Sequence, residues 1–163
     1  MEPGAVVEGY YPDEPYSEVI PGLFQANAAL SPAEMLSLFD VVIDVGGRDR
    51  WVGDPDPRYS FHPLEDVPHI ADAEMIHELG ERIASLVVDG KRVAVNCLGG
   101  VNRSGLLIAR ALVEIGATPE EAIAAVRTAR GPMALGNPRF VRFLLKECTP
   151  RVLARRRQLS LPL

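Results

Sequence analysis

Residues 93–105 read VAVNCLGGVNRSG, and the interpretation of the whole chain starts from this stretch. The apolar run 93–95 predicts a buried strand, and the apolar pattern from Leu106 to Ile115 predicts a long helix. Between them lies a short loop, with Cys97 at the end of the strand and Arg103 at the start of the helix. A strand, a glycine-containing loop and a helix N-terminus in this order are typical of a site that holds a phosphate.

The residue types of this loop, residues 97–103 (the phosphate loop), indicate chemistry as well as binding. Backbone N–H groups and the helix dipole favour an anion, and Gly99 and Gly100 let the backbone approach it closely. The Arg103 guanidinium can bind two phosphate oxygens at once. These positive surroundings are expected to lower the pKa of Cys97 below about 8.5, which makes its thiolate a nucleophile. The predicted phosphate-binding residues are Leu98, Gly99, Gly100, Val101, Asn102 and Arg103, and Ser104 is predicted to assist departure of the sulfur.

A proton donor for the leaving oxygen is predicted upstream, in the segment 61–69. Asp66 lies 31 positions before Cys97, after an expected strand and before an expected helix. A carboxyl group there can protonate the leaving group and then activate water. Weaker candidates for this role are Glu65, Asp72, Asp54 and Asp56.

No metal or other cofactor is predicted. The three histidines (His62, His69, His77) show no metal-ligand spacing with the two cysteines. Phosphoryl transfer by a thiolate, an arginine and a carboxyl group requires no metal.

The chain resembles the cysteine-dependent protein phosphatases, specifically the small dual-specificity branch in its compact bacterial form. The family pattern is His-Cys-x-x-Gly-x-x-Arg-Ser/Thr, and Cys97, Gly100, Arg103 and Ser104 match it. The resemblance implies that these residues are nucleophile, loop former, phosphate clamp and thiolate stabiliser, and that Asp66 is the general acid. It extends from about residue 17 to residue 147, with 20–24 as the opening strand and 137–140 as the start of the last helix.

Asn96 departs from the family pattern, which has His before the nucleophile. An amide can donate a hydrogen bond to the loop but carries no positive charge. The hypothesis is therefore an active enzyme in which the pKa of Cys97 is higher than is usual for the family, with its pH optimum shifted upward. The alternative is a catalytically weak relative that binds phosphoproteins.

The predicted fold class is α/β, a single domain with a small, mostly parallel central sheet flanked by helices, as in cysteine phosphatases. Strands are expected at 41–45 and 91–96, and a polar loop at 46–59. Trp51 in this loop is expected either to wall the active site or to cover the sheet edge. Ser31-Pro32-Ala33-Glu34 and Thr118-Pro119-Glu120-Glu121 read as helix starts with capping boxes. Helices are expected at 32–38, 71–89, 106–115, 118–130 and from 137 onward.

Three segments are predicted along the chain: an irregular N-terminal arm (1–17), a catalytic domain (18–150) and a basic C-terminal tail (151–163). At 163 residues the chain fits one domain, and its net charge of −5 argues against a nucleic-acid partner. No apolar stretch is long enough to span a membrane, and no signal peptide is recognised. Two cysteines suit a reducing cytoplasm.

The predicted function is thus a cytoplasmic phosphatase whose partner is a phosphorylated protein substrate. It would hydrolyse phosphotyrosine, with phosphoserine and phosphothreonine as further substrates, through a cysteinyl-phosphate intermediate. The loop lacks Lys between Cys97 and Arg103, which argues weakly against polyphosphorylated inositol lipids. The same loop would also serve an enzyme for RNA 5′-phosphates or sugars. A sulfur-transfer domain is the third interpretation, and the spacing of Arg103 and Asp66 favours phosphate chemistry over it.

Overall fold

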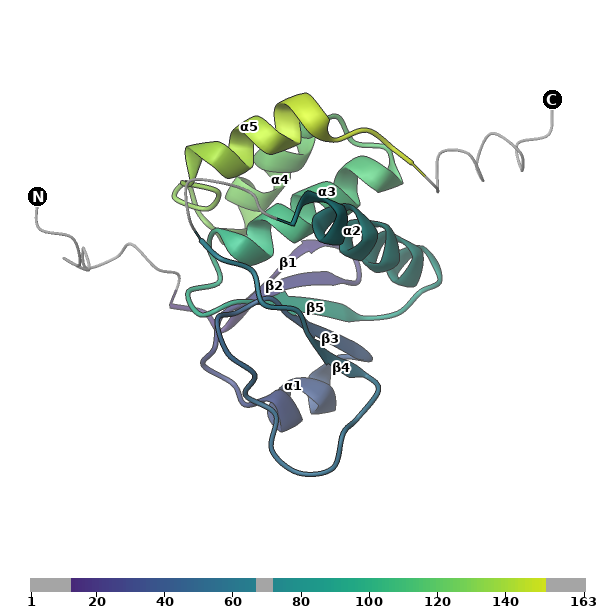
Figure 1. Ribbon diagram of the computed structural model, residues 1–163, viewed down its shortest axis with the longest axis vertical. Coiled ribbons are helices and arrows are strands. Elements are labelled where there is room, and N and C mark those ends of the chain that lie inside the picture. The colour runs from purple at the N-terminus through teal and green to yellow at the C-terminus, as the bar shows by residue number, and fades with distance from the viewer. Residues whose placement is uncertain (1–12, 67–71, 152–163) are drawn as a thin grey trace, which may run out of the picture.

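The computed structural model describes residues 13–66 and 72–151, which form one α/β domain (Figure 1). This confirms the predicted fold class. The strands are β1 (Tyr16–Ile20), β2 (Leu23–Ala26), β3 (Val41–Asp44), β4 (Tyr59–Phe61) and β5 (Val93–Asn96). The helices are α1 (Pro32–Leu38), α2 (Ala73–Val88), α3 (Arg103–Ile115), α4 (Pro119–Arg130) and α5 (Pro138–Glu147).

The five strands form one sheet in the order β1-β2-β5-β3-β4. Only the β1–β2 pair is antiparallel, so the sheet is mostly parallel, as predicted. β5 is central, with Val95 opposite Gln25 of β2 and Ile43 of β3. The carboxyl ends of β2, β5 and β3 therefore meet at one edge of the sheet, which is where ligands bind in open α/β sheets.

Helices cover the two faces of the sheet unequally. The short helix α1 lies on one face, and α2, α3, α4 and α5 lie on the other (Figure 1). Residues 104–114 of α3 are all buried, as its apolar sequence predicted. The phosphate loop is thus held between the central strand and the most deeply buried helix.

Local sequence signals define two helix starts. The Ser31 hydroxyl accepts a hydrogen bond from the Glu34 backbone N–H, and the Glu34 carboxylate accepts one from the Ser31 N–H. Thr118 and Glu121 make the same reciprocal pair before α4. Both predicted capping boxes are therefore confirmed.

The opening strand was predicted wrongly as one continuous element. Pro21 and Gly22 form a turn between β1 and β2, and Gly22 adopts φ +86°, a left-handed conformation that glycine takes at no steric cost. β1 begins at Tyr16, inside the segment assigned to the irregular arm, because the Tyr16 ring packs edge-on against Phe24 and Phe39. The rest of that segment up to residue 12, including Tyr10 and Tyr11, lies outside the described residues.

At the other end of the chain, Arg151 is the last described residue. Its backbone N–H donates to the Glu114 carboxylate at 2.8 Å, and its guanidinium pairs with Glu74 and Glu81, both at 3.1 Å. Arg151 is thus anchored to α2 and α3, whereas the other residues of the predicted basic tail lie outside the described part.

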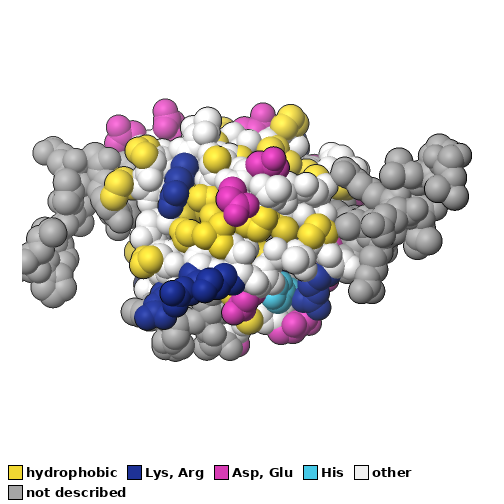
Figure 2. Space-filling model, turned by 90° about the horizontal axis from the view of Figure 1, so that it is seen from above, with side chains coloured by type: hydrophobic (Ala, Val, Ile, Leu, Met, Phe, Trp, Pro, Cys, Tyr) yellow, Lys and Arg dark blue, Asp and Glu magenta, His cyan; other side chains and the backbone are white. Residues whose placement is uncertain are grey.

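The face formed by α4 and α5 carries exposed hydrophobic side chains in a central band with basic side chains on both sides (Figure 2). Within residues 13–66 and 72–151, no helix is both long enough and apolar enough to cross a bilayer.

Candidate active site

The phosphate loop follows a path that only glycine permits at residue 100. Gly100 has φ +65°, and a Cβ there would lie 2.8 Å from the Ala26 carbonyl oxygen and 2.7 Å from Nη2 of Arg130. Both distances are shorter than real Cβ contacts, so a side chain would displace the loop. Gly100 therefore lets the loop pack directly on the end of β2.

Cys97 lies at the bottom of this loop and is only 3% exposed. Its Sγ is 3.3 Å from Oγ of Ser104, the residue that the sequence predicted to interact with the sulfur. Gln25 of β2 donates from Nε2 to the Ser104 hydroxyl at 3.2 Å and to the Gly100 carbonyl at 3.0 Å. Gln25 thus orients the serine and holds the loop, a role that the sequence analysis missed. The sequence could have indicated this role, because Gln25 is an amide within the otherwise apolar strand β2, which is buried throughout.

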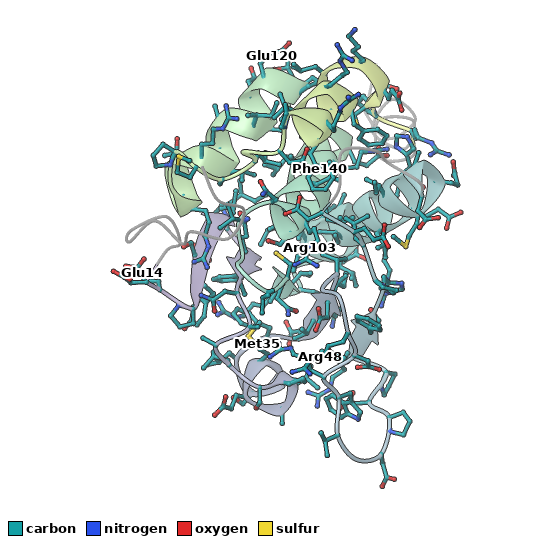
Figure 3. The ribbon with its side chains drawn as sticks, turned by 60° about the vertical axis from the view of Figure 1, so that its left-hand side comes forward. Glu14, Met35, Arg48, Arg103, Glu120 and Phe140 are labelled. Carbon is teal, nitrogen blue, oxygen red and sulfur yellow. The ribbon has the colours of Figure 1, made fainter. Side chains whose placement is uncertain are left out.

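Arg103 is half-buried and reaches between two other loops. Its Nη1 donates to the Leu64 carbonyl at 3.4 Å and lies 3.8 Å from where a Cβ of Gly47 would stand. In Figure 3, Arg103 lies at the centre of the view, where the helices meet the sheet edge, and Arg48 lies below it on the loop after β3. The guanidinium is thus placed beside the phosphate loop with most of its donors unused by these contacts.

Asp66 is exposed and tied to the phosphate loop. Asn102 Nδ2 donates to its Oδ2 at 3.2 Å, and Asn137 Nδ2 donates to its Oδ1 at 2.9 Å. The Asn102 Oδ1 in turn accepts the Asn137 backbone N–H at 3.1 Å. Two amides from different elements therefore fix the carboxyl group of Asp66, which the sequence spacing predicted as the proton donor. Asn137 was noted only as a helix start, and its role as an orienting group was missed.

Asp56 and Asp54, two of the weaker candidates for the proton donor, make other contacts. The Asp56 carboxylate hydrogen-bonds the Arg58 guanidinium at 2.7 Å, and these bonds lower the pKa of Asp56. The Asp54 carbonyl accepts the indole N–H of Trp51, whose ring packs on Tyr59 at 5.2 Å. Trp51 thus covers the edge strand β4. Of its two predicted positions, the structure shows the one at the sheet edge.

A cavity of about 520 Å³ opens beside the phosphate loop. Its volume lies in the range of small-ligand pockets, about 300–1,000 Å³. Leu98 at its rim is 71% exposed. The described residues that line it come from the loop after β2, the end of β3 and the loop that follows, the end of β5, and the phosphate loop: Ala28, Asp44, Gly46, Gly47, Arg48, Arg50, Asn96, Cys97, Leu98 and Arg103.

Two solved structures that resemble this chain carry the names of dual-specificity phosphatases. Human DUSP28 superposes with a TM-score of 0.72 at 24% identity, covering 83% of this chain and 94% of its own. A mouse putative dual specificity phosphatase, complexed with zinc tungstate, gives 0.66 at 24% identity and covers 90% of both chains. The chain has the fold of the dual-specificity phosphatases.

A third structure with this phosphatase fold is the human tyrosine phosphatase-like serine/threonine/tyrosine-interacting protein, with a TM-score of 0.65 at 21% identity. It covers 79% of this chain and 92% of its own. No protein-family model and no curated protein matches the chain in sequence. The likeness to solved structures therefore establishes the fold alone.

Asn96 directly precedes Cys97 at the end of β5, and it is fully buried. Neither its Nδ2 nor its Oδ1 has a hydrogen-bond partner among the described residues. The hydrogen bond that an amide at this position can donate to the loop is therefore not made within the described part of the chain. Its neighbour in the sheet, Asp44, accepts the Tyr59 hydroxyl at 2.6 Å, and burial together with this bond raises the pKa of Tyr59.

Arg130 brings a positive charge beneath the loop of the phosphatase fold. It ends α4 and is only 4% exposed. Its Nε donates to the Gly100 carbonyl at 3.0 Å, and its Nη1 donates to the Glu14 carbonyl and the Ser17 hydroxyl at 2.9 and 3.0 Å. Burial lowers the pKa of Arg130, and a favourable interaction with the charge of Cys97 opposes that shift. Arg130 thus holds the phosphate loop from below through the Gly100 carbonyl, and sequence reasoning missed it because it lies in another helix.

Replacing Arg130 by Gln is expected to slow iodoacetamide alkylation of Cys97 at pH 7 by about threefold to tenfold, because a nearby cation favours the thiolate. The rate of mass increase at Cys97 measures this. Arg127→Gln is the matched control, because Arg127 lies on the same helix and also binds backbone carbonyls, those of Ala134 and Leu135. Equal slowing in both variants would contradict a role of Arg130 through its charge.

Proposed function

We propose that this protein is a phosphatase that hydrolyses phosphotyrosine, with phosphoserine and phosphothreonine as further substrates, through a cysteinyl-phosphate intermediate. The observation that carries the proposal is the link between Asp66 and the phosphate loop. Asn102 of this loop donates to the Asp66 carboxylate at 3.2 Å, although Asp66 lies 36 positions away along the chain. A carboxyl group fixed beside a loop that begins with a buried cysteine is the arrangement that acid-assisted thiolate attack needs.

The proposed reaction has two steps. The Cys97 thiolate attacks phosphorus, the ester P–O bond breaks, and Asp66 gives its proton to the leaving oxygen. In the second step Asp66 takes a proton from water, the water oxygen bonds to phosphorus, and the S–P bond breaks to return the thiolate. Arg103 and the loop N–H groups stabilise the phosphoryl oxygens in both steps. In the structure the Cys97 thiol donates to the Ser104 Oγ at 3.3 Å, and in the proposed second step the Ser104 hydroxyl donates instead to the departing thiolate.

The setting of the site supports a protein substrate that presents an aromatic phosphate. The cavity of about 520 Å³ beside the loop has room for an aromatic ring, and Leu98 provides an exposed apolar contact at its rim. A thiolate nucleophile also needs a reducing compartment, so we propose that the protein works in the cytoplasm.

The test is hydrolysis of para-nitrophenyl phosphate with EDTA present, from about pH 5 to about pH 8.5. Turnover that is insensitive to EDTA and is lost on alkylation supports the proposal. Burial raises the pKa of Cys148 to about 11, so the alkylating reagent distinguishes the two cysteines across this range. Absence of turnover at every pH would contradict it.

Asp66→Asn is expected to lower kcat by about 10²-fold with phosphotyrosine peptides, because the leaving oxygen then departs without a proton. The adjacent Glu65→Gln is the matched control, since Glu65 is equally exposed, and it should retain wild-type rates. Equal losses in both variants would assign the effect to the loop rather than to Asp66.

The alternative is a phosphoprotein-binding relative with little turnover. Asn96 favours it, because this buried amide carries no charge and, among residues 13–66 and 72–151, makes no side-chain hydrogen bond to the loop. One neighbour in fold is itself called phosphatase-like and interacting. Binding of a phosphotyrosine peptide without any hydrolysis of para-nitrophenyl phosphate would favour this function.

A further inference from the structure

The Ser104 hydroxyl is enclosed and has few groups to which it can donate. Ser104 lies in the first turn of α3 and is fully buried, so bulk water does not reach it. A serine in a helix commonly donates to the carbonyl three or four residues before it, and these carbonyls belong to Val101 and Gly100. Among residues 13–66 and 72–151, the Ser104 side chain is hydrogen-bonded to Gln25 and Cys97 and donates to neither carbonyl.

The carbonyls of Gly100 and Val101 are already occupied by other donors. The Gly100 oxygen accepts from Nε2 of Gln25 and from Nε of Arg130, both at 3.0 Å. The Val101 oxygen accepts from the Leu135 backbone N–H at 3.2 Å and from Gln25 Nε2 at 3.3 Å. Because a carbonyl oxygen has two lone pairs, neither oxygen has one left for the serine hydroxyl. Gln25 supplies one of the two donors in both cases.

The Gln25 side chain does not accept the serine hydrogen itself. Its Nε2 lies 3.2 Å from Oγ of Ser104, and an amide nitrogen donates but does not accept. Its Oε1 has no hydrogen-bond partner among the described residues. The amide cannot be turned round, since Oε1 in the place of Nε2 would face the oxygens of two carbonyls. Gly105 leaves room for the amide, because a Cβ at this position would lie 3.2 Å from Nε2.

The remaining partner for the Ser104 hydrogen is the sulfur of Cys97, 3.3 Å away. We propose that Gln25 is a positioning residue, which occupies both competing carbonyls and thereby directs the Ser104 hydrogen to this sulfur when it becomes a thiolate. The proposal rests on the proposed function and concerns its second step, in which the water oxygen bonds to phosphorus and the S–P electron pair stays on sulfur. The hydroxyl stabilises the charge of the departing thiolate, while Asp66 takes the proton from water.

Gln25→Leu tests this role, because leucine is close to glutamine in size and has no side-chain donor. Each carbonyl then regains a lone pair that competes with the sulfur for the serine hydrogen. Hydrolysis of the cysteinyl phosphate is expected to slow by about threefold to tenfold, the contribution of one hydrogen bond. Formation of this intermediate, which kcat/KM for para-nitrophenyl phosphate reports, should stay within about twofold of wild type.

Rapid mixing, an acid quench and intact mass measure the phosphate on Cys97 over time. An equal loss in kcat/KM would overturn the proposal, because it would show that Gln25 only supports the loop. Gln25→Met keeps the length of the side chain and carries the same expectations. It replaces Gln25→Leu if a melting curve shows that the leucine variant is unfolded.

Ser104→Ala separates the two effects of Gln25 on the site. In this background Gln25→Leu should cause no further slowing, because no hydroxyl remains to be directed. Arg127→Gln is the matched control, since Arg127 also donates to two backbone carbonyls, and it should hydrolyse the intermediate at the wild-type rate. Equal slowing with and without the Ser104 hydroxyl would overturn the proposal, as would the same slowing in Arg127→Gln.

The amount of Cys97 thiolate separates this proposal from the proposed function, because its ultraviolet absorbance is measured without a substrate. Cys148 contributes no thiolate at pH 7, since burial raises its pKa to about 11. The ratio of thiolate to thiol should fall by about threefold to tenfold in Gln25→Leu, and it should be the same in Ser104→Ala and the double variant. An unchanged ratio in Gln25→Leu would overturn the proposal even in an active phosphatase. A lowered ratio in a protein without turnover would support the role of Gln25 and refute the phosphatase function.

Discussion

Replacing Cys97 by Ser is expected to lower kcat for para-nitrophenyl phosphate by at least about 10⁴-fold. A serine hydroxyl stays protonated at neutral pH, and removal of a nucleophile commonly costs this much or more. Cys97 is 3% exposed and its Sγ contacts the Ser104 hydroxyl, so a serine of nearly the same shape fits without disturbing the loop. A steady-state assay with enough protein to detect the residual rate measures the loss.

The second cysteine supplies the control for this variant. Cys148 is also buried, at the end of α5, and Cys148→Ser should keep kcat within about twofold of wild type. The Cys97→Ser variant should still bind phosphate competitors with wild-type affinity. Activity within tenfold of wild type in Cys97→Ser would refute the cysteinyl-phosphate mechanism.

Arg103→Lys is expected to lower kcat/KM by about 10³-fold, although the positive charge is retained. In the proposed mechanism the planar guanidinium binds two oxygens of the phosphoryl group in the transition state, and an ammonium group cannot reproduce this geometry. The substitution also removes the Nη1 contact with the Leu64 carbonyl at 3.4 Å, which aligns the arginine with the segment that carries Asp66. Steady-state kinetics with a phosphotyrosine peptide measure the effect.

The exposed Arg142 on α5 is the reference for the same chemical change, and Arg142→Lys should behave as wild type. Melting temperatures within a few degrees of wild type would show that Arg103→Lys is folded. A loss of less than tenfold in Arg103→Lys would mean that the loop N–H groups alone stabilise the transition state.

Local patterns predicted much of this molecule. The two capping boxes, the buried helix after the phosphate loop and the strand before it depend on residues close in sequence, and each lies where the patterns indicated. The β1–β2 hairpin was missed because Pro21 and Gly22 were read as part of a strand, whereas the left-handed φ of Gly22 makes the turn.

The parts of the site that sequence reasoning missed are contacts between distant segments. Gln25 and Arg130 both reach the Gly100 carbonyl, from a strand and a helix that lie 75 and 30 positions away from it. Asn137 reaches Asp66 across 71 positions. No period or spacing relates these residues, since only the packing of the finished domain brings them together. Arg48 and Arg50 were noted only as part of a polar loop for the same reason.

The contact between Arg130 and Glu14 bears on sequence alignments of the protein and on the choice of a starting residue for truncated versions. Arg130 binds the backbone carbonyl of Glu14 and not its carboxylate, so residues of many types could stand at position 14 and make the same bond. An alignment of related sequences would therefore show variation there and suggest that the segment is dispensable. A recombinant version trimmed to begin at β1 would nevertheless lose one of the anchors of the arginine beneath the phosphate loop. The first residues before β1 matter by their presence rather than by their identity.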